Sequence, residues 1–217
     1  MRAWVCAFAL WSITTSPLLA KEEELRASPG GLAIGMLEHA DAVDLFEVLP
    51  SEQIAVRHQR SGLICRFALE GDGRVIVFPG LPRGEDVGCD ETSGNVSVTF
   101  YATRYPEPAS VDALLAGGVQ AIQARFPSAT PYEPTGAPDT SLSTLPLPEN
   151  RSARFHIFLQ NGSPMFTRVS VVLINGWAFK MRFTMPGSDA ESMQAADARA
   201  DREWAALLEE LRAIPNL

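Results

Sequence analysis

The residues nearest to a nucleophile and a general base in this sequence are Ser61 and His58, which stand three positions apart. A serine hydroxyl becomes a useful nucleophile when a histidine takes its proton, and a third group must orient that histidine. No third group can be identified here, and the Gly-x-Ser-x-Gly pattern of many hydrolases is absent. We therefore interpret His58 as part of a polar turn and keep a hydrolase using His58 and Ser61 as an alternative.

Metal binding has little support in the residue pattern. The histidines, His39, His58 and His156, lie far apart, and no His-x-x-x-His or Cys-x-x-Cys spacing is present. Acidic residues near Cys89 could offer oxygen ligands to calcium, namely Glu85, Asp86, Asp90 and Glu91. They lack the alternating ligands and fixed glycine of a calcium-binding loop, so we interpret them as a solvated acidic loop. We expect no metal and no cofactor.

A set of basic residues in the C-terminal half could instead bind an anion: His156, Arg168, Lys180 and Arg182. Guanidinium and ammonium groups recognise carboxylates and phosphates, and a cationic patch on an acidic protein would attract such groups. If the surface that carries these residues is open, it suits a small anionic ligand or an acidic partner protein. If a helix covers it, the same residues are expected to form ion pairs with that helix.

These basic residues belong to the stretch around which the chain is organised, residues 165–213. Met165–Ile174 and Trp177–Met185 are rich in β-branched and aromatic residues, and the Asn-Gly pair between them predicts a β-hairpin. Every other residue from Trp177 to Met185 is large and apolar, so one face of this strand is expected to lie in the core.

The length of the hairpin loop decides which side chains share a face. A two-residue loop places Val171 opposite Lys180, whereas a three-residue loop places Ser170 opposite Arg182. Turn statistics favour the shorter loop and side-chain chemistry favours the longer one. We predict the longer loop, which gathers the four basic residues on the sheet face opposite the apolar stripe.

A long helix is predicted directly after the hairpin. Ser188 and Glu191 match a Ser-x-x-Glu capping box, which satisfies backbone N–H groups at a helix start. Apolar residues then recur at steps of three and four, at Met193, Ala196, Ala200, Trp204, Leu207, Leu208 and Leu211. The acidic residues between them are expected to face water: Asp197, Asp201, Glu203, Glu209 and Glu210.

The rest of the chain predicts short strands separated by turns. An N-terminal meander is predicted at Ile54–His58, Gly62–Ala68 and Arg74–Phe78, and further strands at Asn95–Tyr105 and Ser152–Gln160.

Other segments predict a helix and two long connections. A helix capped by Ser110 should run to about Phe126, and Gly117-Gly118 in its middle indicates close packing against another element. Pro79–Ser93 is predicted as a loop, and the proline-rich Pro127–Arg151 as a long exposed crossing or the lining of a site. Residues 21–53 show no pattern that separates helix from strand.

The N-terminus and the composition set the compartment. Residues 1–20 predict a secretory signal peptide cut after Ala20, with an apolar run shorter than the ~20 residues needed to cross a bilayer. We therefore expect one exported domain, residues 21–217, in the periplasm or secreted, with no transmembrane anchor after cleavage. The formal net charge of −8 argues against nucleic acid or anionic lipid as a main partner.

Cysteine usage supports the same compartment. Cys6 leaves with the signal peptide, so Cys65 and Cys89 remain as an even pair in an oxidising environment. We predict a disulfide between them. The alternative, a reactive thiol, would need an electropositive setting such as the neighbouring Arg66.

The predicted element order, from Val96 to the C-terminus, resembles that of the photosystem extrinsic subunit PsbP and its relatives. The strand, helix, loop, three-strand meander and closing helix carry this resemblance, with Arg168 to Met185 as its clearest part. The segment from His58 to Cys65 looks more like small exported proteins of Gram-negative bacteria. The resemblance implies an α/β/α sandwich and a mostly non-catalytic accessory or binding role.

The sequence as a whole predicts an α+β protein, an antiparallel sheet covered by helices and preceded by a strand meander. We expect an exported, non-catalytic binding protein that recognises a partner protein or a small anionic ligand. The alternatives are the hydrolase described above and a structural envelope protein.

Overall fold

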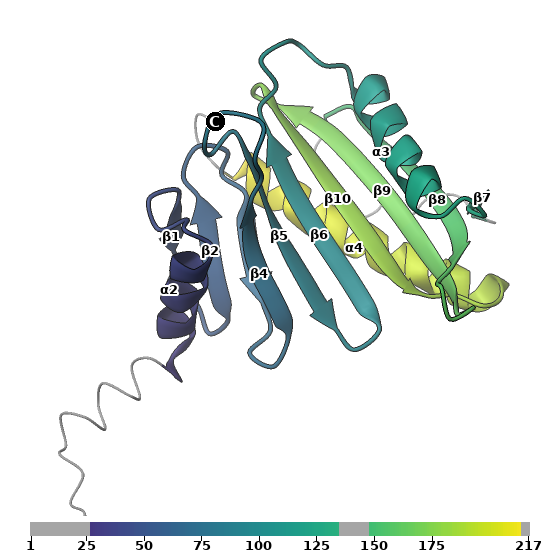
Figure 1. Cartoon of the computed structure of the whole chain (residues 1–217), viewed down its shortest axis with the longest axis horizontal. Helices are drawn as coiled ribbons and strands as arrows, with labels where there is room; N and C mark the ends of the chain where they lie inside the picture. The colour runs from purple at the N-terminus through teal and green to yellow at the C-terminus, as the bar shows by residue number, and fades with distance from the viewer. Residues whose placement is uncertain (1–26, 135–147, 214–217) are drawn as a thin grey trace, which may run out of the picture.

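The computed structural model describes residues 27–134 and 148–213 (Figure 1). The predicted signal peptide lies outside these ranges, as does most of the proline-rich crossing. The helices are α2 (Pro29–His39), α3 (Val111–Arg125) and α4 (Ala190–Arg212). The strands are β1 (Phe46–Val48), β2 (Ile54–His58), β3 (Ile64–Phe67), β4 (Asp72–Val77), β5 (Asp86–Ser93), β6 (Val96–Thr103), β7 (Thr130–Pro131), β8 (Asn150–Phe158), β9 (Pro164–Ile174) and β10 (Trp177–Pro186).

These elements form an α+β fold with two antiparallel sheets. The larger sheet has seven strands in the order β4-β5-β6-β10-β9-β8-β7, so β10 of the predicted hairpin lies at its centre. The smaller sheet has three strands in the order β1-β2-β3. The predicted N-terminal meander is therefore divided, because β2 and β3 belong to the small sheet and β4 to the large one.

The hairpin is confirmed, but its predicted three-residue loop is wrong. Trp177 pairs with Ile174, so the turn contains only Asn175 and Gly176, and Lys180 lies opposite Val171. Both turn residues have positive φ, 50° at Asn175 and 80° at Gly176. That backbone shape matches the twist of the paired strands, and the Asn-Gly sequence adopts it at low cost.

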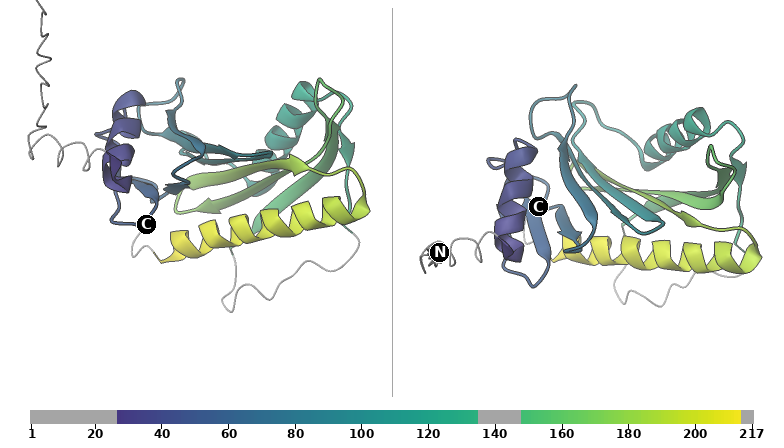
Figure 2. Two further views of the ribbon diagram at one scale, coloured as in Figure 1. Left: turned by 90° about the horizontal axis from the view of Figure 1, so that it is seen from below. Right: turned by 60° about the horizontal axis from the view of Figure 1, so that its bottom comes forward.

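The two faces of the large sheet are covered unequally (Figure 2). On one face α4 runs across the strands, and its predicted apolar residues, from Met193 to Leu211, are all buried. They share a core with α2, with the small sheet and with the apolar face of β10. On the opposite face α3 packs over β8 and β9 around a separate core that includes Ile122 and Val169. Strands β4, β5 and β6 carry no helix on that face (Figure 1).

Two predicted boundaries differ from the structure. The N-cap of α4 is Asp189, not Ser188, because the Asp189 carboxylate accepts a hydrogen bond from the Ser192 backbone N–H and the Ser192 hydroxyl accepts one from Asp189 N–H. The predicted loop Pro79–Ser93 contains β5 in its second half. There Asp86 and Asp90 accept hydrogen bonds from Thr103 and Thr99 on β6, so strand-disfavoured carboxylates are satisfied across the sheet.

The glycine pair in α3 serves close packing at one of its two positions. A Cβ on Gly118 would lie 2.8 Å from Cγ2 of Val169 on β9, closer than side-chain carbons approach. A Cβ on Gly117 would meet nothing within 4 Å. The expected close contact is therefore confirmed for Gly118 alone.

Candidate functional site

The hairpin register divides the predicted cationic patch between the two faces of the sheet. Residues paired across antiparallel strands point to the same face. Arg168 pairs with Phe183, in the core beneath α4, whereas Arg182 pairs with Val169, in the core beneath α3. Lys180 lies on the same face as Arg182. The prediction that all four basic residues share one face is therefore wrong.

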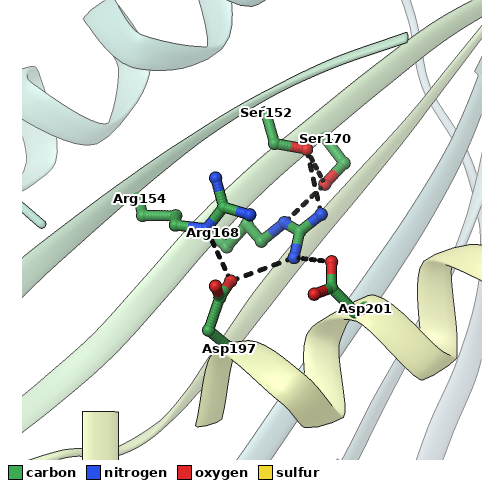
Figure 3. A network of polar contacts seen from close by, with 6 residues as sticks. All are labelled: Ser152, Arg154, Arg168, Ser170, Asp197 and Asp201. Atoms are coloured by element: carbon green, nitrogen blue, oxygen red, sulfur yellow. Dashed lines mark hydrogen bonds and ion pairs between the residues drawn. The ribbon is translucent and has the colours of Figure 1, made fainter. Parts of the chain in front are cut away.

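Arg168 lies in a buried polar network between the sheet and α4 (Figure 3). Its Nη1 donates to Asp197 Oδ1 at 3.0 Å and to Asp201, its Nη2 donates to Ser152 Oγ at 3.1 Å, and its Nε donates to Ser170 Oγ at 2.9 Å. Only 3% of Arg168 and 6% of Asp197 is exposed. Arg168 therefore has the helix-paired role weighed above as the alternative to ligand binding.

Arg154 completes this network and balances its charge. It lies directly opposite Arg168 on β8, and its Nε donates to Asp197 Oδ1 at 2.6 Å. Two arginines thus meet two aspartates. The expectation that Asp197 faces water is wrong, because the sheet supplies two guanidinium groups above it.

His156 lies on the α4 side of the sheet, the side of Arg168 and the opposite one from Lys180 and Arg182. It pairs with Phe166, and its ring contacts Phe158 with centroids 4.7 Å apart. Its Nε2 is buried and has no hydrogen-bond partner in the described residues. It therefore does not contribute to a surface with Lys180 and Arg182.

The open half of the α3 face contains the largest of the cavities described here, about 930 Å³ in volume. We call it the groove; strands β4, β5, β6 and β10 form its floor, and the C-terminal end of α3 stands beside it. Its lining includes the charged and hydroxyl side chains of Arg74, Thr99, Tyr101, Arg125, Arg182 and Thr184.

Arg182 is the central cation of the groove. Its Nε donates to Thr167 Oγ1 at 2.9 Å, and its Nη nitrogens have no hydrogen-bond partner within the described ranges. Burial lowers the pKa of its guanidinium, the Tyr101 phenol opposes this shift, and the positive charge of Arg125 lowers the pKa further. The carboxylate of Asp90 also lines the groove but pairs with Arg74, so an anion between Arg182 and Arg125 would be stabilised by both cations.

Lys180 lies two residues before Arg182 on the same face. Its Nζ lies over the Tyr101 ring, 4.1 Å from the centroid, and Tyr101 in turn stacks on Phe78. Burial lowers the pKa of Lys180, while the negative charge of Asp86 acts in the opposite direction. Burial also raises the pKa of Tyr101, so the phenol stays neutral at physiological pH.

A second cavity, about 410 Å³ in volume, opens along the N-terminal half of α3. We call it the slot. Leu114 and Gly117 of α3 line it on one side, Val171 and Ala178 of the sheet on the other, and Lys180 also borders it. The groove and the slot therefore lie along the same helix and share strand β10.

His58 and Ser61 do form a hydrogen-bonded pair, with 2.8 Å between Nδ1 and Oγ, but both residues are fully buried. The Ser61 oxygen also accepts from Leu63 N–H, and the Ser61 backbone N–H points to the same ring nitrogen. Burial lowers the pKa of His58 from 6.5 to about 4. The pair stabilises a turn, and a substrate could not reach it without local opening.

The predicted acidic loop near Cys89 is occupied by internal contacts. Glu85 pairs with Arg60, and Glu91 accepts from Ala68 N–H at 2.8 Å. Among the described residues, no three metal-ligating side chains come close enough to hold an ion. The disulfide between Cys65 and Cys89 is confirmed and joins β3 to β5.

Three features of the site are not evident in the sequence. They are the position of Arg125 beside the groove, the contribution of β5 to the floor of the groove, and the slot. The Gly117-Gly118 pair is the sequence feature closest to predicting the slot, because it indicates that another element packs closely against α3. Arg125 could not be assigned because its position depends on how α3 crosses the sheet.

Comparisons with known proteins add little to this site. No family model matches the chain, and no curated protein matches it. Among solved structures, a protein of unknown function from Pseudomonas aeruginosa is similar at 9% sequence identity with a TM-score of 0.37, over 76% of this chain and 98% of that one. A likeness of this size supports no conclusion about function. In the described residues, no helix is both long and apolar enough to cross a membrane.

Proposed function

We propose that this chain is an exported, non-catalytic binding protein that holds a small anionic ligand in the groove beside α3. The observation that carries this proposal is the set of unpaired cations there. Arg125 and Arg182 in the groove, and Lys180 at the adjoining slot, form no ion pair with any described carboxylate, although the chain has 26 acidic and 18 basic residues.

Other basic residues show that carboxylates are available when pairing is needed. Arg74 at the groove margin pairs with Asp90 at 2.9 Å, and Arg66 pairs with Glu210 at 2.6 Å. The free Nη nitrogens of Arg182 form a planar fork that matches a carboxylate or phosphate group. The nearby Thr99 and Thr184 hydroxyls are already engaged with Asp90 and Thr167, so the guanidinium groups would carry the recognition.

A PsbP-like sandwich is part of this proposal at the level of fold. Its support is that α4 lies on one face of the large sheet and α3 on the other (Figure 2). The proposed export rests on the predicted signal peptide, and the disulfide is compatible with it.

Titration with inorganic phosphate and with succinate, followed by NMR of arginine Nε–H signals, tests the binding function. We expect the Arg182 and Arg125 signals to shift saturably, and Arg182→Met to abolish the shift at Arg125. Arg57→Met is the matched control, because Arg57 is half-exposed, pairs with Glu47 and does not line the groove. Shifts that are unchanged in Arg182→Met, or absent in the original protein, would overturn the proposal.

A further inference from the structure

The slot differs from the groove in its chemistry. Apart from Thr103, Tyr105 and Lys180, its lining consists of apolar residues and glycines. Leu114 and Val171, which both line it, belong to the same apolar cluster beneath α3. Open apolar cavities of this size commonly receive the apolar part of a ligand.

Packing within the protein does not account for the empty space at Gly117. Its neighbour Gly118 is required by Val169, but a Cβ at 117 would meet no atom within 4 Å. A glycine in a helix interior costs about 1 kcal/mol relative to alanine. Gly117 is exposed and lines the slot, so a side chain at this position would extend into the mouth of the slot.

The position of the cations connects the slot to the groove. Lys180 borders the slot, and Arg182, two residues further along β10, lines the groove. Gly117 and Arg125 are eight residues apart on α3, a distance of roughly 12 Å along the helix axis. A molecule lying along α3 could therefore place an apolar part in the slot and an anionic group between Lys180, Arg182 and Arg125.

We propose that the ligand is an amphiphilic anion, with an aliphatic tail in the slot and a carboxylate, sulfate or phosphate head group at the groove cations. This inference rests on the binding function proposed above and specifies its ligand class. The protein takes the amphiphile as a single molecule. We do not expect the protein to bind the amphiphile at a membrane surface, because its net charge of −8 repels anionic membranes.

Calorimetric titration with decanoate, octanoate, acetate and neutral 1-decanol, all below their aggregation concentrations, tests the ligand class. Each methylene moved from water to the slot should tighten binding roughly fourfold, so decanoate should bind about 15-fold more tightly than octanoate. Acetate should bind weakly, and 1-decanol should bind at least tenfold more weakly than decanoate because it has no charge for Arg182.

Two variants of α3 separate the slot from the head-group site. Gly117→Leu fills the slot without a backbone clash and should weaken decanoate binding at least tenfold while leaving acetate binding unchanged. Ala116→Leu is the matched control, because Ala116 is exposed and lines neither cavity, and it should bind decanoate normally. Cooperative thermal unfolding of both variants verifies the fold.

The outcomes distinguish this inference from the binding function beneath it. Anion binding that is lost in Arg182→Met but does not depend on tail length or on Gly117→Leu would overturn the amphiphile and keep the anion site. Equal binding of 1-decanol and decanoate, unaffected by Arg182→Met, would overturn the charged head group. Binding of none of the anions would overturn both.

Discussion

Arg168 and Arg182 occupy neighbouring strands of one sheet, yet their environments differ completely. Arg168 meets two aspartates and two serine hydroxyls within the protein. Arg182 donates to a single threonine and keeps the rest of its guanidinium available. A fully satisfied buried charge contributes to the fold, whereas a partly satisfied one at a cavity can serve a ligand.

Replacing Arg168 should therefore destabilise the protein strongly. Arg168→Met leaves Asp201 without its partner and Asp197 with Arg154 alone, and we expect a loss of about 3–5 kcal/mol in unfolding free energy. Urea denaturation measures it. Arg57→Met removes an exposed pair with Glu47 and should cost less than about 1 kcal/mol. Equal losses in the two variants would contradict the structural role of the network.

His58 should make stability depend on pH in a defined window. Its pKa is about 4 in the folded protein and 6.5 as the reference value, so the unfolded state binds a proton first as the pH falls. Stability should decrease from pH 6.5 to pH 4 by about 3 kcal/mol and show no further contribution from this group below pH 4. Above pH 6.5 the imidazole is neutral in both states.

Urea denaturation of the original protein and of His58→Gln over this pH range tests the assignment. Glutamine keeps an acceptor for the turn and removes the titration, so the pH slope of the variant should be smaller by about one proton. Identical slopes would show that another group is responsible.

The residues able to bind an anion could be identified from the sequence, but their structural environment could not. Lys180 and Arg182 were expected to be available for an anion, and both line cavities. Arg168 was included with them because the sequence gives no sign that Asp197 and Asp201 approach from α4. Such an approach depends on the packing of elements far apart in the chain.

At the scale of elements, the hairpin register decided which predictions were correct. The Asn-Gly sequence indicates a two-residue turn through its backbone preference, and that preference is realised. The argument from side-chain pairing failed because it treated Val171 opposite Lys180 as unfavourable. In the structure the Lys180 Nζ lies over the Tyr101 ring on β6, a partner outside the hairpin.

The two glycines of α3 should respond oppositely to substitution by alanine. Gly117→Ala gains helix propensity in open space and should stabilise the protein by about 1 kcal/mol. Gly118→Ala forces a Cβ against the stiff, buried Val169 and should destabilise it by about 1–3 kcal/mol despite the same propensity gain. Thermal unfolding measures both, and a destabilised Gly117→Ala would contradict the open slot.

Long periodic elements were predictable, and polar ones were not. The apolar stripe of α4 and the alternating face of β10 are both buried as expected. Strand β5 was missed because Asp86, Asp90 and Glu91 mask its alternation. Their hydrogen bonds come from β6 and from Ala68 N–H, and no local pattern reveals them.

At the scale of the molecule, the disulfide fastens the small sheet to the large one. Cys65 and Cys89 lie 24 residues apart, with Cα atoms separated by 5.9 Å. Replacing both by alanine should lower the unfolding free energy by roughly 3–4 kcal/mol in the chain-entropy model. Chemical denaturation with and without reductant measures it. An unchanged midpoint in the reduced protein would show that packing between the sheets suffices.

The net negative charge is evident from the sequence. The sequence does not show that the carboxylates pair with basic residues elsewhere and leave the groove cations unpaired. Within residues 27–134 and 148–213, most basic residues outside the groove are paired with carboxylates, so their charge is locally cancelled. The groove retains uncancelled positive charge within an acidic surface. Such a field would attract small anions while the remainder of the molecule repels large anionic surfaces.

The cations beside α3 also have a consequence for how the chain folds. If β10 slipped by one residue against β9, Lys180 and Arg182 would enter the apolar layer beneath α4, where Met181 and Phe183 now lie. Burial of these two cations among apolar side chains would destabilise the mispaired sheet. The residues proposed to hold a ligand therefore also favour the correct strand register.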